Sequence, residues 1–78
     1  MKRPRTGKYQ HYKGDFYRVI GVARHSESPK DEFVVYQALY KSKKFGNNEL
    51  WIRPKKMFLE DVNLEGKKVP RFRFVRKE

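Results

Sequence analysis

The chain has 78 residues, which is enough for one small domain. It carries 20 basic and 9 acidic residues, a formal net charge of +11, and no cysteine. Disulfides and thiolate metal sites are therefore excluded, and the thin core of so small a domain disfavours enzymes that must enclose a large substrate. The lack of cysteine and of any apolar run of about 18 residues predicts a cytoplasmic protein with no membrane association.

The positive charge is concentrated at the two ends of the chain. Residues 1–13 contain five basic and no acidic residues, and residues 67–78 contain six basic residues and one acidic residue. Residues 14–66 are almost balanced, with nine basic and eight acidic residues. Basic segments bind phosphate backbones without reading sequence, and they also keep proteins soluble. The ends are thus predicted to bind nucleic acid or another polyanion, with solvated charge as the alternative.

The first half of the chain is expected to begin with a flexible basic arm over residues 1–6, because Pro4 interrupts any regular pattern. The domain itself is expected over residues 7–75, followed by a charged end over 76–78. A short aromatic-rich stretch at 9–12 leads into a turn at 14–15. Residues 16–25 form the first clear strand, and Gly21 in its middle predicts a bulge or sharp bend.

The second half continues with a polar loop at 26–31, a strand at 32–40, a lysine-rich loop at 41–49 and a short strand at 50–53. Pro54 suits the start of a helical turn over 55–58. A turn at 65–66 precedes the last strand at 69–75. The pattern predicts a mainly β fold, namely a small SH3-like antiparallel barrel of about five strands with one short helical turn. An open sheet with one helix packed on it is the alternative.

The string Arg24-His25-Ser26-Glu27 stands at the end of the first strand. Histidine titrates near neutral pH, and Glu27 could share the face of His25 and orient its ring. His25 and Ser26 do not make a catalytic pair, because neighbouring strand residues point to opposite faces. The alternative is that Ser26 and Glu27 only shape a turn, and no catalytic residue is assigned.

A metal site would need His11 and His25 together with a carboxylate such as Glu27 or Asp15. The sequence contains neither an H-x-H nor an H-E-x-x-H spacing. We therefore predict no metal ion and no other cofactor.

Tyrosine and tryptophan are more numerous than a thin core needs, and they favour interfaces because each joins an apolar body to a polar tip. Trp51 and Arg53 would project from the same side of a strand, where an aromatic plane beside a guanidinium suits stacking on a base or gripping an anion. The alternative is that Trp51 is a core residue and Arg53 forms a surface ion pair. We expect one concave face to be lined by eight residues: Tyr9, His11, Arg24, His25, Glu27, Tyr36, Trp51 and Arg53.

Several strings, taken in their order and spacing, resemble a small bacterial family catalogued as a domain of unknown function, number 1653. The strings that carry the resemblance are Gly7-Lys8-Tyr9, His11-Tyr12-Lys13-Gly14, Arg24-His25-Ser26-Glu27, Val35-Tyr36-x-x-Leu39-Tyr40, Trp51-x-Arg53-Pro54, Met57-Phe58 and Val69-Pro70-Arg71-Phe72. The resemblance covers residues 7–74 and implies an SH3-like barrel without an established activity. Residues 41–49 are longer and richer in lysine than the family's usual hairpin, and the basic ends lie largely outside its pattern.

The sequence therefore predicts a small monomeric binding module for an anionic or aromatic ligand, such as a nucleotide or a nucleic-acid segment. A protein–protein adaptor that contacts its partner through the aromatic face is the alternative. A small hydrolase-type enzyme that uses His25 and Glu27 is a third hypothesis.

Overall fold

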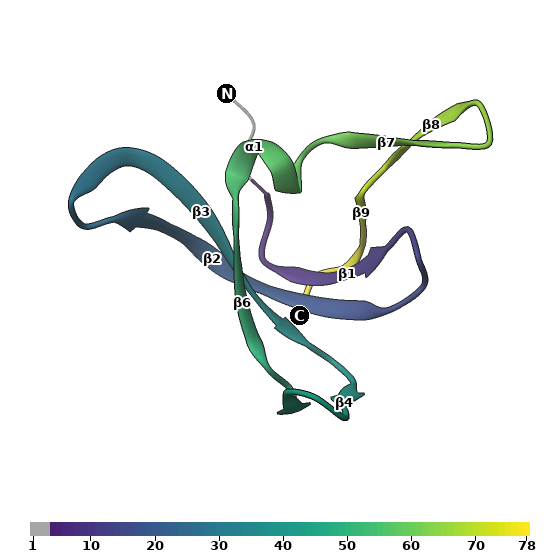
Figure 1. The fold of residues 1–78 in the computed structure, drawn as a ribbon, viewed down its shortest axis with the longest axis horizontal. Helices are drawn as coiled ribbons and strands as arrows, with labels where there is room; N and C mark the ends of the chain where they lie inside the picture. Colours follow the sequence, from purple (N-terminus) through teal and green to yellow (C-terminus); the bar gives the residue numbers. More distant parts are fainter. Residues whose placement is uncertain (1–3) are drawn as a thin grey trace.

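The structure is a computed structural model that describes residues 4–78, and antiparallel strands dominate it (Figure 1). The main sheet has five strands in the order β6-β3-β2-β1-β9. Their bounds are β1 Gly7–His11, β2 Phe16–His25, β3 Ser28–Ala38, β6 Leu50–Pro54 and β9 Phe72–Arg76. The predicted mainly β, antiparallel class is confirmed. Since β6 and β9 are the edge strands, the described sheet is open rather than a closed barrel, which is the alternative arrangement that the sequence allowed.

Two small hairpins extend from this sheet. One pairs β4 (Lys41–Ser42) with β5 (Gly46–Asn47), and the other pairs β7 (Asp61–Leu64) with β8 (Lys67–Pro70). The predicted turn at 65–66 is confirmed, because Glu65 and Gly66 both have positive φ, as the two-residue turn of a hairpin requires. The strand before this turn, β7, was not predicted, and the predicted last strand at 69–75 is divided between the end of β8 and β9, with a break at Arg71.

The hairpin between β2 and β3 is longer than the sequence indicates. The predicted loop at 26–31 is wrong, because His25 pairs with Ser28 and only Ser26 and Glu27 form the turn. Figure 1 shows this hairpin reaching away from the rest of the sheet. Its side chains are polar because they face solvent beyond the core, so their polarity does not mark a loop.

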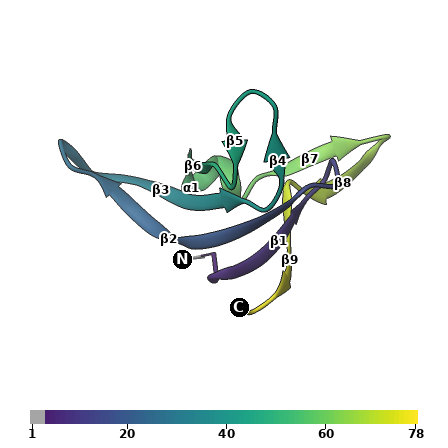
Figure 2. The same ribbon diagram turned by 90° about the horizontal axis from the view of Figure 1, so that it is seen from below.

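Gly21 marks a bulge in β2, as predicted. The register passes from Val19 opposite Tyr36 to Gly21 opposite Val35, so Ile20 is the additional residue. The bulge adds local bend and twist to the strand. Figure 2 shows β2 and β3 curving along the sheet below α1 and β6.

The core lies on the inner face of the sheet, which is the face covered by α1 (Lys55–Phe58). The helix follows Pro54, as predicted. Phe58 is 2% exposed and stacks parallel on Phe72, with ring centroids 4.2 Å apart. Tyr9 and Tyr36 each contact the Phe58 ring at 5.5 Å. One short helix thus closes the core by inserting a single aromatic ring among those of three strands.

The predicted N-terminal arm is described only in part, because residues 1–3 lie outside the described residues. The carbonyl of Arg5 accepts a hydrogen bond from the Tyr9 hydroxyl at 2.7 Å, and its guanidinium lies 3.8 Å from the centroid of Phe74. Arg5 therefore packs against the domain. Across residues 4–78, no helix has the length and apolar character needed to cross a membrane.

Candidate functional site

The structure divides the eight predicted site residues into two groups. Arg24, His25 and Glu27 lie at the end of the β2–β3 hairpin. The other five lie on the inner face of the sheet, contributed by β1, β3 and β6: Tyr9, His11, Tyr36, Trp51 and Arg53. One concave face therefore does not hold all eight.

Arg24 stabilises the hairpin. Its Nη1 donates to the carbonyl of Pro29 at 2.7 Å, and its Nη2 lies 3.5 Å from a carboxylate oxygen of Glu32. Both partners belong to β3, the strand opposite. The guanidinium thus holds two strands together where no core does.

His25 and Glu27 meet through the backbone. The Glu27 N–H donates to Nδ1 of His25 at 3.1 Å, and both residues are exposed. Within residues 4–78 the Glu27 carboxylate makes no hydrogen bond to the ring. A general base oriented by a carboxylate needs that bond, so the arrangement matches a turn and not a catalytic pair.

The two histidines lie near opposite ends of β2. His11 follows Gln10, which pairs with Phe16 at the start of that strand, whereas His25 ends it. Among residues 4–78, no three histidine, aspartate or glutamate side chains come close enough to hold a metal ion.

Tyr9 and Trp51 belong mainly to the core. Tyr9 is 6% exposed, and its hydroxyl is used by the Arg5 carbonyl. Trp51 is partly buried, packs against the core and makes an edge contact with Phe45 at 5.1 Å. Both residues therefore contribute mainly to packing on the inner face.

The rest of the inner face carries a group of polar side chains, which we call the inner cluster: His11, Tyr17, Tyr36, Tyr40 and Arg53. All but Tyr40 contact the ring of Phe72, and Tyr40 contacts Tyr17. Tyr17 is central to it, with edge contacts to Tyr36 at 5.4 Å and to Phe72 at 5.6 Å. The hydroxyls of Tyr17 and Tyr40 are hydrogen-bonded at 2.9 Å. Burial and this hydrogen bond raise the pKa of Tyr17, so its hydroxyl keeps its proton throughout the physiological range.

Arg53 is the cation of the inner cluster. Its Nε donates to the Tyr36 hydroxyl at 3.3 Å, and its guanidinium carbon lies 5.6 Å from the centroid of Phe72. The residue is partly buried, and it forms no ion pair with any residue from 4 to 78. Its four terminal N–H groups therefore have no protein acceptor within residues 4–78.

His11 borders the same Phe72 ring at 4.9 Å. Its Nδ1 accepts the N–H of Lys13 at 3.2 Å, so the neutral ring carries its hydrogen on Nε2. Burial, and next the positive charge of Arg53, hold the pKa of His11 below its ordinary value. A hollow of about 330 Å³ adjoins this ring, with the following lining: Gln10, His11, Tyr12, Leu64, Val69, Pro70 and Arg73.

The eight predicted site residues do not include Tyr17 or Tyr40. A signal for both was present. Tyr17 shares the parity of buried Val19 along β2, and Tyr40 continues the parity of Val34 and Tyr36 beyond β3. The sequence therefore indicates that Tyr17 and Tyr40 lie on the same face as the core residues, but it does not indicate that their hydroxyls are hydrogen-bonded to each other.

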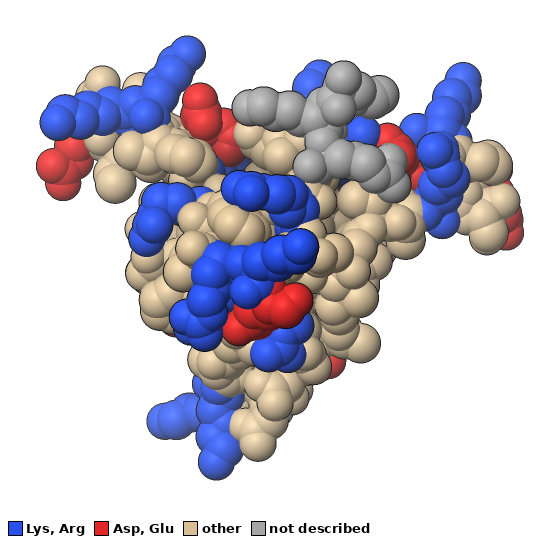
Figure 3. All heavy atoms as spheres, turned by 180° about the vertical axis from the view of Figure 1, so that it is seen from behind, with Lys and Arg blue, Asp and Glu red and all other residues tan. Residues whose placement is uncertain are grey.

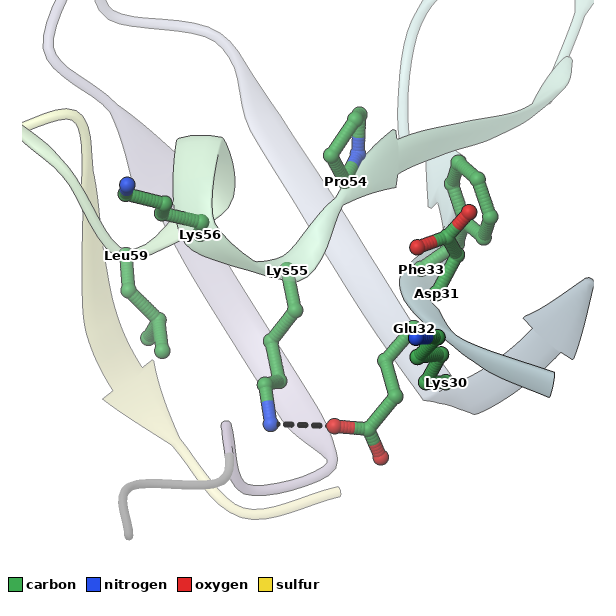
Figure 4. A pocket seen from close by; sticks show the side chains of 8 residues that line it. All are labelled: Lys30, Asp31, Glu32, Phe33, Pro54, Lys55, Lys56 and Leu59. Carbon is green, nitrogen blue, oxygen red and sulfur yellow. Dashed lines mark hydrogen bonds and ion pairs between the residues drawn. The ribbon is translucent and has the colours of Figure 1, made fainter. Parts of the chain in front are cut away.

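A second hollow, of about 690 Å³, lies where α1 meets β3 (Figure 4). In it Lys55 of α1 pairs with Glu32 of β3, and the two side chains are 14% and 12% exposed. Figure 4 shows the two reaching toward each other across the hollow. The ion pair connects the helix to the sheet, so we assign this hollow to the packing of α1 against β3 and not to a ligand site.

Comparison with known proteins agrees with this architecture. The family model described as "Protein of unknown function (DUF1653)" matches residues 7–74. A crystal structure of a DUF1653 protein from Bordetella bronchiseptica is similar at 33% identity and a TM-score of 0.83, over 96% of this chain and 91% of that one. No curated protein matches the chain. The chain therefore belongs to the DUF1653 family.

Proposed function

We propose that this domain is a binding module that takes an anionic or aromatic ligand, such as a nucleotide or a nucleic-acid segment, on the inner cluster. The observation that carries the proposal is that Arg53 is partly buried and has no ion-pair partner within residues 4–78. Its guanidinium is partly buried, one N–H is used by Tyr36, and no described carboxylate neutralises it. A partly desolvated cation without a counter-ion is costly, and an anionic group would supply the missing acceptors.

The neighbours of Arg53 suit the rest of such a ligand. The Nε2–H of His11 adds a second donor, and the hydroxyls of Tyr17 and Tyr40 add hydrogen-bonding groups that are already ordered by each other. The partly exposed rings of His11, Tyr17 and Tyr40 offer aromatic surface to a base or another planar group. The lack of cysteine supports a cytoplasmic setting for this function.

The experiment is a titration with a purine nucleoside monophosphate, with inorganic phosphate and with a short labelled single-stranded RNA, followed by amide chemical shifts. Shifts are expected at His11, Tyr17 and Arg53. Arg53→Gln should weaken binding by about tenfold or more, the usual value of a charge-assisted hydrogen bond. The matched control is Arg24→Gln, which removes the same charge from the far hairpin and should leave affinity within about twofold.

Two results would reject the proposal. One is the absence of binding at low salt by all three probes. The other is a set of amide chemical-shift changes confined to the β2–β3 hairpin or to the outer side of β1 and β9, together with equal affinities of Arg53→Gln and Arg24→Gln for the probes.

A protein–protein adaptor is the second candidate, and exposed apolar side chains favour it. Leu50 and Ile52 of the edge strand β6 are 57% and 63% exposed, and Ile20 in the bulge is 50% exposed. Single exposed apolar residues are ordinary, whereas neighbouring ones mark contact surfaces. Loss of a stable partner on Ile52→Asn, with retention on Arg53→Gln, would favour the adaptor over the ligand-binding module.

A further inference from the structure

The basic residues that the sequence places at the two ends of the chain lie side by side in the folded sheet. Strand β1 pairs with β9, so that Lys8 lies opposite Arg76, and it pairs with β2, so that Lys8 also lies opposite Arg18. Three cations thus stand in one row across three strands. Arg18 belongs to the nearly neutral middle of the sequence, so no count of charge along the chain reveals this row.

The row lies on the outer face of the sheet. Tyr9 points into the core, and side chains alternate along a strand, so Lys8 and its β2 partner Arg18 point the other way. A register shift between Lys8 and Tyr9 brings Arg76 opposite Lys8, and Glu78 contacts both Arg18 and Arg76, which places Arg76 on the same side. Figure 3 views the molecule from behind and shows basic side chains gathered around an acidic group on this side. We call Arg18, Lys8 and Arg76 the outer basic row.

A carboxylate occupies the outer basic row in this structure. Like charges directly opposite each other on neighbouring strands are destabilising. Glu78 offsets that repulsion, because one of its oxygens lies 2.9 Å from Nε of Arg18 and the other lies 3.3 Å from Nη2 of Arg76. The hydrogen bond from Arg18, with the charges of Arg18, Arg76 and Lys8, lowers the pKa of Glu78.

We propose that the outer basic row is a docking site for the phosphodiester backbone of nucleic acid, and that Glu78 competes with the phosphate for it. Two oxygens of one anion held by two separate guanidinium groups is a geometry that phosphate shares with carboxylate. Arg73 extends the site, since it pairs with Gln10, two residues along β1 from Lys8, and its Nη2 donates to Oε1 of Gln10 at 2.6 Å.

The chemistry favours nucleic acid over an anionic membrane. Arginine exceeds lysine in the row, and its planar fork suits phosphodiester oxygens. Phe16 lies beside this row, and the ammonium of Lys8 lies over its ring at 4.5 Å. The outer basic row shares no residue with the inner cluster, which occupies the opposite face of the sheet.

The test measures the affinity of the whole chain for a labelled single-stranded RNA at two salt concentrations. Glu78→Gln should raise affinity about three- to tenfold, which is the worth of roughly one phosphate contact at low salt. Its matched control is Glu65→Gln, which removes one negative charge from the β7–β8 turn and should raise affinity by less than about twofold. Equal gains for the two variants would overturn the competition by Glu78, because net charge alone would explain them.

Arg18→Gln should lower affinity and reduce the salt slope by about 0.7–0.9, as expected for one lost contact to a single or double strand. The control Lys30→Gln on the β2–β3 hairpin should leave the slope unchanged. The double variant Arg18→Gln/Glu78→Gln should lose most of the gain given by Glu78→Gln. Equal slopes for Arg18→Gln and Lys30→Gln would overturn the site.

Two further arms separate this proposal from its competitors. Phosphatidylserine-containing vesicles that bind with the same dependence on Arg18, while RNA does not, would assign the row to a membrane surface and overturn the proposal. The effects of Glu78→Gln and Arg18→Gln should be the same in an Arg53→Gln background, because the inner cluster lies on the opposite face of the sheet. A failure of the inner cluster to bind a nucleotide would therefore reject the proposed function and leave the outer basic row standing.

Discussion

The Nε of Arg53 donates a hydrogen bond to the hydroxyl of Tyr36, and the two side chains share the ring of Phe72 as a neighbour. They come from adjacent strands, in which Tyr36 pairs with Trp51 and Val34 pairs with Arg53. The buried phenol thereby fixes the direction in which the guanidinium points. Pre-orientation of this kind lowers the entropy lost when a charged side chain grips a ligand.

Tyr36→Phe tests that relationship. The ring contacts of Tyr36 remain, so stability should fall by about 0.5–1.5 kcal/mol for the lost hydrogen bond. Affinity for a nucleotide should fall as well, because Arg53 loses its anchor. Urea unfolding with an unchanged slope and a lower midpoint measures the first effect, and a binding titration measures the second. Tyr12→Phe is the control, since the Tyr12 hydroxyl makes no hydrogen bond within residues 4–78. Equal affinity of the two variants would contradict the anchoring role.

The lowered pKa of His11 predicts a pH dependence of stability. Burial and the charge of Arg53 disfavour the protonated ring in the folded state, so below the unfolded value of about 6.5 the unfolded chain binds more protons. The free energy of unfolding should therefore rise with pH from the folded pKa up to about 6.5, and fall as the solution is acidified through that window. His11→Gln should flatten this part of the profile, as measured by urea unfolding between about pH 5 and pH 8. His25→Gln should leave the contribution of His11 in place.

The same linkage should couple protons to ligand. The cationic Arg53 lowers the pKa of His11, so an anion paired with Arg53 should raise it. Reciprocity then requires anion affinity to increase as the pH falls through the His11 titration. The measurement is the NMR titration of the His11 ring proton with and without inorganic phosphate. An unchanged titration at saturating phosphate would place the bound anion away from Arg53.

Much of the fold could be predicted from the sequence, because local rules and tertiary structure agree over most of it. The strand at 16–25, the bulge at Gly21 and the helical turn after Pro54 all follow from local chemistry. The β2–β3 hairpin could not be read in the same way. Its outer half does not pack on the core, so its residues are polar and give the sequence pattern of a loop. Backbone pairing and the hydrogen bond of Arg24 hold the two strands together there.

For the candidate site, the sequence could predict several of the residues, but it could not predict which of them contact each other. Trp51 and Arg53 were paired by their spacing, yet the nearest polar partner of Arg53 is Tyr36 on the neighbouring strand. His25 was predicted as a site residue because Glu27 lies two residues further along the chain. In the fold, it is the backbone N–H of Glu27 and not its carboxylate that bonds to Nδ1 of His25. Cross-strand register decides these contacts, and register depends on the bulge and turns of the whole sheet.

Gly7 limits how β1 can approach β9. It has φ of 140°, and a Cβ built there would lie 2.5 Å from the carbonyl oxygen of Arg76. Gly7→Ala should therefore cost at least about 2 kcal/mol from backbone strain and overpacking together. Gly21→Ala is the matched control, since a Cβ there meets nothing within 4 Å. Thermal or urea unfolding of both variants checks the difference. Similar stabilities would show that the β1–β9 contact relaxes at no cost.

Phe58 is the residue on which both the core and the inner cluster depend. Its ring is 2% exposed and lies parallel to Phe72 at 4.2 Å, so it supports from one side the ring that Tyr17, His11 and Arg53 contact. Phe58→Ala should cost about 3–5 kcal/mol, a large share of the roughly 4–12 kcal/mol expected for a chain of this length.

Phe58→Leu keeps apolar volume and should leave a folded domain in which Phe72 has lost its stacking partner. Nucleotide affinity should then fall although Arg53 and Tyr36 are intact, because the surface that orients them is less rigid. Leu59→Ala, at a neighbouring residue that is 39% exposed, should change both stability and affinity little. Unfolding curves and binding titrations of the three variants separate the effects. If Phe58→Leu lowers stability without lowering affinity, the inner cluster is held by β1, β2 and β3 alone, and α1 serves only to close the core.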